Sequence, residues 1–171
     1  MHSWQEIPDF YGYSVSDAGG VRNDRTGRLL SQAITERGVH VGLSRDRIQY
    51  TRMVARLVAE AFLDLPDLSY HRQTFTTPIN RDGDRTNNHV NNLLWRPRWF
   101  AVKYHQQFRT NWGQRCLIRD LNTGDVFYSL IETAKTYGVL ASEILMDSMS
   151  QERTNGVWPI GHHFEIILNN T

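Results

Sequence analysis

A dense run of polar side chains lies in residues 78–95, in the stretch PINRDGDRTNNHVNNLLW. It holds two carboxylates, Asp82 and Asp84, several amides and one imidazole, that of His89. Carboxylate oxygens bind hard divalent cations and an imidazole can act as a general base, so these residue types allow a metal site that activates water. The same acids and amides also build tight turns around a glycine such as Gly83, because their side chains accept nearby backbone N–H groups. Both interpretations stay open, and turn building is the favoured one.

The elements that must position this run are predicted from the hydrophobic period. Short strands and turns are expected in residues 1–50, where apolar and polar residues alternate between glycines. In residues 51–63, TRMVARLVAEAFL, apolar residues recur at helical spacing, which predicts an amphipathic helix. A second helix is predicted from about Arg98 to Phe108, because Pro97 suits a first helical turn. The polar run therefore lies between two predicted helices. The aromatic residues that follow it are expected in the core: Trp95, Trp99 and Phe100.

Beyond the second helix, the pattern predicts a hairpin, two short helices and a closing strand. The hairpin turns at Asn122-Thr123-Gly124. Ser129 and Glu132 have the spacing of a capping box at the start of the next helix, and Gly138 suits its end. The second short helix and the closing strand correspond to the stretches LASEILMDSMS and GHHFEIIL.

The composition is that of a globular protein, with 40% hydrophobic and 22% charged residues and a net charge of +1. Apolar runs are too short for a membrane span, and the first residues have no pattern of a signal peptide. A single cysteine, Cys116, excludes a disulfide framework and a cysteine-rich zinc site, and favours a reducing compartment such as the cytoplasm.

Charge is distributed unevenly along the chain. Residues 1–119 hold 17 of the 19 basic residues and 11 of the 18 acids, a net of +6. Residues 120–171 hold 2 basic residues and 7 acids, a net of −5. Such asymmetry is typical of modules with different partners.

The order of these elements resembles that of the phage HNH homing endonucleases. The stretch WQEIPDFYGYSVSDAGGVRN is similar to a nuclease-associated modular motif that precedes many of these enzymes, in which a Trp, an Ile and a Y-x-V-S-x-x-G-x-V phrase recur. LVAEAFL resembles the helix before the nuclease core, and DGDRTNNHVNNLLW resembles the loop of the core. The tail from Ile118 to Phe164 is similar to the helix-turn-helix repeat that ends many of these enzymes.

The resemblance implies an α+β fold with three modules. Residues 1–50 would form a small β-rich nuclease-associated module. Residues 51–112 would form an HNH-like ββα core. Residues 113–171 would form a hairpin followed by a helix-turn-helix.

The resemblance also identifies the positions where HNH chemistry takes place. An HNH site uses a His to deprotonate water and a divalent metal to stabilise the leaving oxygen. The His of the family stands two residues before Asp-Gly, which in this chain is Asn80. The metal-ligand positions fall on Ile79 and, six residues after the Trp, on Ala101, whereas the scaffold Asn is kept as Asn92. Three chemical positions are thus degenerate, and no confident catalytic residue is assigned.

Two other side chains are possible substitutes. Asp84 and His105 lie close enough in the sequence to the lost positions to form a displaced site. No cofactor is expected otherwise, and Mg²⁺ or Mn²⁺ would be needed only if the nuclease site is active.

Double-stranded DNA is the expected partner because of the basic residues around the polar run. The segment from Trp95 to Arg119 has six positive residues and no acid, and a helix beginning there would place part of them along a phosphate-facing edge. A second basic set lies on a turn near residue 25. The predicted DNA-binding residues are Arg22, Arg25, Arg28, Arg96, Arg98, Lys103 and Arg109.

Three functions are compatible with these patterns. The favoured one is a DNA-binding protein on an HNH homing-endonuclease scaffold, with cleavage lost or greatly weakened. The alternatives are an active metal-dependent nicking enzyme with a displaced site, and a domesticated protein-interaction module whose acidic tail binds a protein partner. The expected location is the cytoplasm of a phage-infected host or a prophage-bearing cell, with no membrane partner.

Overall fold

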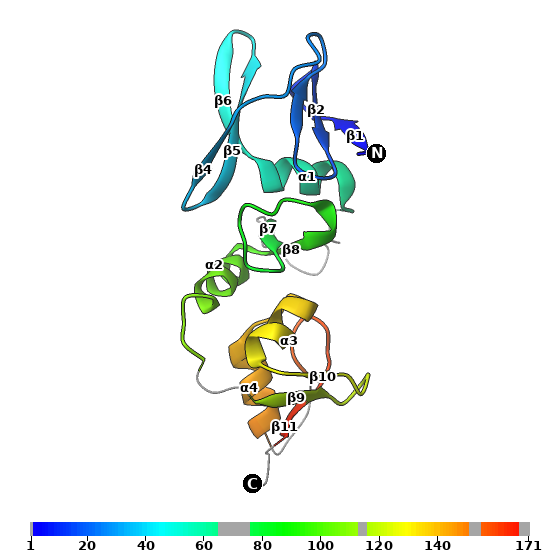
Figure 1. The fold of residues 1–171 in the computed structure, drawn as a ribbon, viewed down its shortest axis with the longest axis vertical. Coiled ribbons are helices and arrows are strands. Elements are labelled where there is room, and N and C mark those ends of the chain that lie inside the picture. Colours follow the sequence, from blue (N-terminus) through cyan, green and yellow to red (C-terminus); the bar gives the residue numbers. More distant parts are fainter. Residues whose placement is uncertain (1, 65–75, 113–115, 151–154, 168–171) are drawn as a thin grey trace. The chain divides into compact units, whose positions relative to one another are not determined.

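The computed structural model describes residues 2–64, 76–112, 116–150 and 155–167 (Figure 1). The chain forms two compact units. The first comprises Met1–Asn80 and Asp84–Ala101, and the second comprises Arg81–Gly83 and Val102–Thr171. Both units mix helices with antiparallel sheets, so the predicted α+β class is confirmed.

Two three-stranded antiparallel sheets build the first part of the first unit. Each is a meander of neighbouring strands, as the alternation of apolar residues between turns predicts. The strands are β1 (Trp4–Glu6), β2 (Tyr13–Ser16), β3 (Val21–Asn23), β4 (Gln32–Thr35), β5 (Gly38–Arg45) and β6 (Ile48–Met53). Val39, Val41 and Leu43 of β5 are buried because they alternate onto the core face of their sheet.

Helix α1 (Val54–Phe62) follows β6 directly. The helix predicted for residues 51–63 therefore begins three residues late, because residues 51–53 pair with β5 and extend the sheet. Helix α1 packs its apolar face against strands of both sheets and against the following hairpin (Figure 1). Val54, Leu57 and Val58 are buried in this core.

The polar run of the sequence joins β7 (Thr76–Asn80) to β8 (Leu93–Pro97). The two strands are antiparallel, with Ile79 opposite Leu94 and Asn80 opposite Leu93. A short 3₁₀ turn, η2 (Val90–Asn92), precedes β8, and helix α2 (Arg98–Gln107) follows it. This order is the predicted ββα core.

The long β7–β8 loop is fixed by contacts with the first sheet. The backbone N–H of Val90 donates to the carbonyl oxygen of Asp17 at 2.7 Å. Gly19 has φ +89°, and a Cβ added there would lie 3.1 Å from the Cβ of Asn88. Glycine suits this position because its backbone lies in the left-handed region and the turn after β2 approaches the β7–β8 loop closely.

The second unit packs two helices against a three-stranded sheet of order β10-β9-β11. Its strands are β9 (Leu117–Asp120), β10 (Val126–Phe127) and β11 (Phe164–Ile167), and its helices are α3 (Leu130–Tyr137) and α4 (Ala141–Met149). Hairpin and helices lie where the sequence predicts them. The closing strand is shorter than predicted, because Gly161–His163 form a separate turn before it. That α3 and α4 act as a helix-turn-helix stays a prediction.

The ends of α3 follow its predicted caps. The Ser129 side chain accepts from the Glu132 backbone N–H at 3.1 Å, and the Glu132 carboxylate accepts from the Tyr128 N–H at 2.7 Å. The helix ends at Gly138, whose φ of 65° is the left-handed C-terminal cap.

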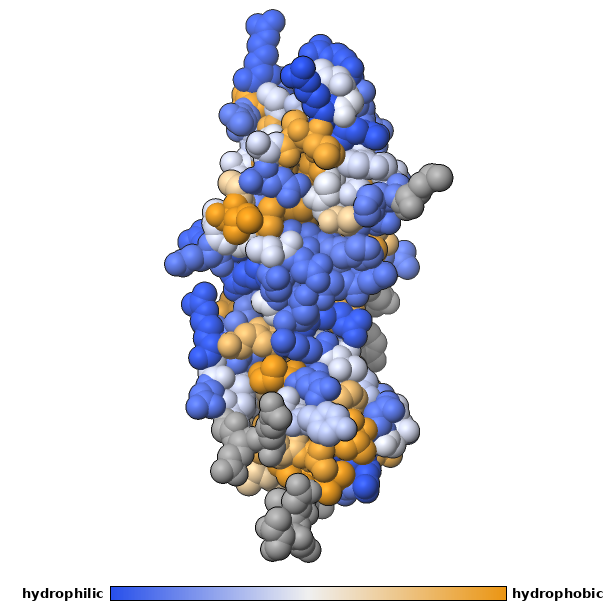
Figure 2. Space-filling model, viewed as in Figure 1, coloured by the Kyte–Doolittle hydropathy of each residue, from blue (hydrophilic) through white to orange (hydrophobic). Residues whose placement is uncertain are grey.

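Hydrophilic residues predominate on the face drawn in Figure 2, where hydrophobic residues appear in separate groups. Among the described residues, no helix combines the length and apolar character that crossing a membrane requires.

Candidate nucleic-acid interface

Asn80, which the resemblance aligns with the catalytic His of the HNH enzymes, is a structural part of the loop. Asn80 is 3% exposed and is the last residue of β7. The amide nitrogen donates to the carbonyl oxygen of Asn87 at 2.8 Å and to the side-chain oxygen of Asn88 at 3.2 Å. An amide does not titrate near neutral pH, so Asn80 cannot accept a proton from water as a general base.

The retained scaffold residue supports the same loop. The side chain of Asn92 donates to the carbonyl oxygen of Asn87 at 2.8 Å, so this oxygen accepts from both Asn80 and Asn92. Two amides thus converge on one backbone group from the end of β7 and from the turn before β8.

The resemblance aligns Ile79 and Ala101 with the two metal-ligand positions of the HNH enzymes, and neither side chain has an atom that binds a cation. Ile79 is fully buried and has an apolar side chain. Ala101 in α2 is 4% exposed and ends at its Cβ. The side chains at these positions, together with the loop-bound amide of Asn80, do not fit a divalent cation. Within the described residues, no group of three or more His, Cys, Asp or Glu side chains could hold a metal ion.

The possible substitute Asp84 makes the contacts of a turn residue. Its carboxylate accepts from the backbone N–H of Thr86 at 2.8 Å and from the Thr86 hydroxyl at 2.7 Å. These bonds, the hydroxyl first, lower the pKa of Asp84 below its ordinary value. The geometry matches the turn-building interpretation of the polar run.

The two histidines near the site have different surroundings. His89 caps η2, where its Nδ1 accepts from the backbone N–H of Asn91 at 3.2 Å. His105 is half-buried in α2, and its ring lies 6.0 Å from the ring of Tyr104, edge to face. Asp84 belongs to the first unit and His105 to the second.

Helix α2 exposes one continuous face. With about 100° per residue, Arg98 and Lys103 lie roughly 140° apart and border this face on either side. The exposed residues between them are uncharged: Trp99, Val102 and Gln106. Arg109, just after the helix, is also exposed.

The inner face of the second half of α2 is tied to the second unit. The side-chain oxygen of Gln107 accepts from the backbone N–H of Ala141 at 2.8 Å, and its nitrogen donates to the carbonyl oxygen of Val139 at 3.4 Å. The buried Tyr104 hydroxyl donates to the carbonyl oxygen of Arg81 at 2.6 Å. These bonds fix which face of α2 points outward.

Arg96 is not part of the helix edge that the sequence suggests. It lies in β8, donates to the carbonyl oxygen of Trp95 at 3.0 Å, and places its guanidinium 5.7 Å from the centre of the Phe100 ring. The reason is that the strand pairing with β7 continues to Pro97, which leaves Arg98 as the first helical residue.

Of the three aromatic residues expected in the core near α2, Trp99 is the exception. Phe100 is fully buried, and Trp95 packs against the core of the first unit. Trp99 is 46% exposed, because its neighbour Phe100 takes the inward position on the helix.

The basic set on the turn after β3 is only partly available for a ligand. Arg22 pairs with Asp24 at 3.0 Å and its guanidinium lies 4.4 Å from the centre of the Trp4 ring. Arg25 and Arg28 are exposed on the turn itself.

Acids of the C-terminal segment are mostly engaged inside the second unit. Asp147 accepts from His163 at 2.9 Å and from the backbone N–H of Phe164 at 2.7 Å. Glu143 is half-buried, and burial raises its pKa while the charge of Lys103 lowers it to a smaller extent. The exposed residues of α4 are the uncharged Ser142, Met146 and Met149. The exposed side of α4 therefore carries no acid.

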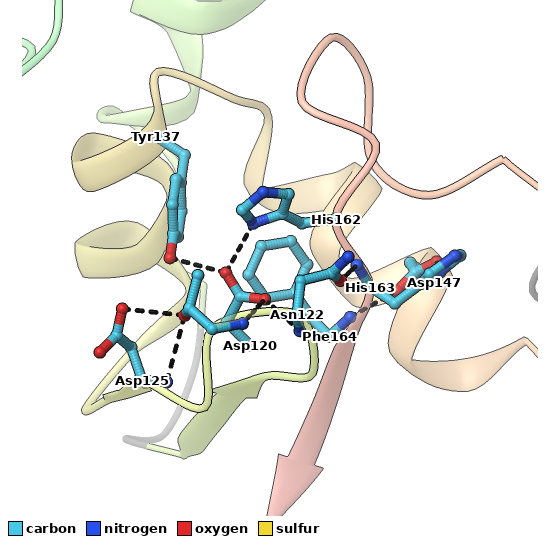
Figure 3. Close-up of polar contacts among 9 residues, drawn as sticks. Asp120, Asn122, Asp125, Tyr137, Asp147, His162, His163 and Phe164 are labelled. Atoms are coloured by element: carbon cyan, nitrogen blue, oxygen red, sulfur yellow. Dashed lines mark hydrogen bonds and ion pairs between the residues drawn. The ribbon is translucent and has the colours of Figure 1, made fainter.

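A buried polar network around Asp120 was not predicted from the sequence (Figure 3). Asp120 is fully buried, and its carboxylate accepts from the Tyr137 hydroxyl at 2.6 Å and contacts Nδ1 of His162 at 2.7 Å. Burial raises the pKa of Asp120, but the bonds from Tyr137, His162 and the Asn122 N–H outweigh it and lower the pKa overall. Burial, followed by the bond to Asp120, raises the pKa of Tyr137 to about 12. Nothing in the spacing of these residues indicates their contact.

Comparisons with known proteins agree with this architecture. Residues 3–42 match the NUMOD4 motif. An uncharacterized HNH endonuclease, L245, of Acanthamoeba polyphaga mimivirus is 32% identical over 92 residues, which are 54% of this chain and 26% of that protein. The chain thus spans about a quarter of the length of this relative.

A solved structure shares the fold. The HNH homing endonuclease I-HmuI, whose structure describes DNA binding and cleavage, superposes with a TM-score of 0.53 at 20% identity, covering 98% of this chain and 99% of I-HmuI. The chain is thus similar to HNH endonucleases in the NUMOD4 motif and in the 92 matched residues, and it shares the fold of an HNH homing endonuclease.

Proposed function

We propose that the protein binds double-stranded DNA on its HNH scaffold and that cleavage is lost or greatly weakened. The observation that carries this proposal is Asn80, which takes the place of the general base and engages its amide in the loop. Losing a positioned base costs a factor of about 10² to 10⁴ in rate. Ile79 and Ala101 add the loss of two metal ligands, so Mg²⁺ or Mn²⁺ has no place in the proposed function.

Helix α2 supports DNA binding. An uncharged strip bordered by Arg98 and Lys103 suits insertion of a helix into a groove, where each basic side chain meets the phosphates of one strand. The exposed Trp99 adds an aromatic surface between them. I-HmuI is described as binding DNA, which agrees with this assignment.

Salt dependence of binding tests the assignment of α2. Replacing Arg98 or Lys103 by Ala should flatten the slope of log affinity against log salt by about one unit for each phosphate contact that the substitution removes, uniformly across DNA sequences. Arg37→Ala, on the turn between β4 and β5, removes the same charge away from α2 and serves as the control. Unchanged affinity and slope in the Arg98→Ala, Lys103→Ala double variant would contradict docking through α2.

The alternative of an active enzyme requires a displaced site. It predicts metal-dependent nicking that depends on Asp84 and His105. The hydrogen bonds of the Asp84 carboxylate to Thr86 favour its structural role instead. A protein-interaction module is a weaker alternative, because the described acids of the tail form internal contacts, for example at Asp120, Asp147 and Glu165.

A further inference from the structure

A cavity of about 440 Å³ lies in the first unit, apart from the β7–β8 loop. It is formed by the loop between β1 and β2, the ends of β5 and β6, and the first turns of α1. Its lining includes three arginines, Arg45, Arg52 and Arg56, and two acids, Asp9 and Glu60. The side chains of the lining therefore carry a net positive charge.

Two of these arginines are stacked against a pair of aromatic rings. Phe10 and Tyr50 lie edge to face at 5.7 Å. The guanidinium carbon of Arg45 is 5.4 Å from the centre of the Phe10 ring and 5.1 Å from that of Tyr50. The corresponding distances of Arg52 are 5.0 and 5.2 Å. Both guanidiniums are therefore held by cation–π contacts with the same two rings.

Strand register explains why these arginines meet. Tyr50 lies opposite Leu43 and Arg52 lies opposite Val41, so Tyr50 and Arg52 share the inward face of the sheet. Arg45 follows Leu43 on the same face, where β5 reaches the edge of the core. Arg45 and Arg52 therefore lie on the same face of the sheet as Tyr50, on either side of it along the strands.

The third arginine differs in its partner. Arg56 pairs with Glu60 at 2.7 Å across one helical turn. Within the described residues, Arg45 and Arg52 form no ion pair with a carboxylate. Arg45 donates to the backbone oxygen of Asp9 at 3.5 Å and forms a side-chain hydrogen bond with Tyr50, and Arg52 donates to the backbone oxygen of Thr51 at 3.2 Å. Each guanidinium has five N–H donors, so further donors stay available.

We propose that this cavity binds a phosphate group of the DNA backbone through Arg45 and Arg52. A guanidinium that stacks on a ring keeps the N–H groups at its edge available, in a fork that matches two oxygens of a phosphate. Stacking also fixes the side chains before the ligand arrives, so little rotamer freedom is lost on binding. The inference rests on the proposed DNA binding and adds a contact site outside α2.

The first arm of the test measures DNA binding by the full chain. The double variant Arg45→Gln, Arg52→Gln should bind duplex DNA roughly tenfold more weakly and reduce the salt slope by about one unit, because the substitutions remove one phosphate interaction. A Lys pair at the same positions keeps the charge without the planar fork, so it should keep the slope and bind more weakly than the wild type. Arg37→Gln is the matched control outside the cavity and should leave the slope unchanged.

The second arm needs no variant and separates DNA from free phosphate. Inorganic phosphate is titrated into ¹⁵N-labelled wild-type protein at constant ionic strength, and the Arg Nε–H resonances are followed. Saturable shifts confined to Arg45 and Arg52 would support the site. Melting temperatures and circular dichroism of each variant show whether the unit still folds.

The outcomes are distinct. An unchanged DNA affinity and slope in the Gln double variant, or an equal loss in Arg37→Gln, would overturn the proposal, even if phosphate alone shifts the two resonances. If the wild type binds no DNA at any salt concentration, the proposed function fails. In that case the phosphate titration decides the role of the cavity. Shifts would show an anion site for a free phosphoryl ligand, and their absence would show that the cavity binds no phosphate.

Discussion

Each unit holds a buried polar cluster that ties a loop to a strand, and the two clusters differ in chemistry. In the first unit, the amides of Asn80 and Asn92 donate to the Asn87 carbonyl oxygen. In the second, the carboxylate of Asp120 accepts from Tyr137 and contacts His162. The first cluster has no group that titrates near neutral pH, whereas every side chain of the second can gain or lose a proton.

The comparison separates two kinds of hydrogen-bonded cluster. Amides such as that of Asn80 supply the hydrogen bonds that shape the loop but cannot transfer a proton. A charged cluster gives stronger hydrogen bonds and makes stability dependent on pH. Four measurements test this contrast.

The largest effect is expected for Asp120→Ala. The substitution leaves the Tyr137 hydroxyl, the His162 ring and backbone N–H groups without their buried acceptor, which should destabilise the second unit by about 3 kcal/mol or more. Hydrogen exchange of the β9 and β11 amides measures the loss. Asp125→Ala is the control, because the Asp125 carboxylate is exposed and accepts from the Thr123 hydroxyl at the surface. Equal protection in both variants would show that the network contributes little.

The stability of the second unit, measured by the same amide protection, should fall at both acid and alkaline pH. The folded-state pKa of Asp120 lies below its ordinary value of 3.8, so its contribution is present above that value and is lost as pH falls through the folded pKa. The pKa of Tyr137 rises from 10.0 to about 12, so the phenol stays protonated in the folded state and stability falls as pH rises between these values. Asp120→Asn should flatten the acid limb. An acid limb that survives this change would have to come from other groups.

A smaller effect is expected for Asn80→Ala in the first unit. It removes two hydrogen bonds, while the Asn87 carbonyl oxygen keeps its bond from Asn92, so the loss should be about 1–2 kcal/mol. The difference from the wild type should not change with pH, since no partner titrates. Denaturant unfolding at several pH values measures it, with the exposed Asn91→Ala as control. A strongly pH-dependent difference would contradict the contrast between the clusters.

The smallest effect is expected at the exposed cap of α3. Ser129→Ala removes the bond to the Glu132 N–H and should cost about 1 kcal/mol at neutral pH. Ser142→Ala is the control, because Ser142 is exposed in the first turn of α4, two residues after the N-cap Leu140. The melting temperature of this variant should change little. If Ser129→Ala lost more stability than Asp120→Ala, the helix cap would contribute more than the Asp120 network, contrary to this prediction.

Local structure was largely predictable because it depends on neighbouring residues. The capping box at Ser129 and the turn at Gly124 follow from short patterns, whereas the ββα order around Asn80 was implied by the resemblance to the HNH homing endonucleases. The degenerate positions follow from the resemblance, by counting from Asp82-Gly83 and Trp95, and their assignment stays a prediction.

Contacts between distant residues were not predictable from such patterns. Asp120, Tyr137 and His162 meet only after the unit folds, and the two stacked arginines meet through strand register. Arg96 lies in β8 and not on a helix edge, because the composition of a basic segment does not show where a strand ends. Trp99 was expected inside because a run of two aromatic residues does not reveal which one faces the core.

Binding without cleavage can be tested on supercoiled plasmid. The purified protein of 171 residues is added with Mg²⁺ or Mn²⁺ at concentrations at which a gel shift shows all the plasmid bound. The bound plasmid should stay supercoiled, because Asn80, Ile79 and Ala101 provide neither base nor metal ligands. Metal-dependent conversion to open circles that disappears in Asp84→Ala or His105→Ala would rule out the proposed loss of cleavage and establish a displaced active site.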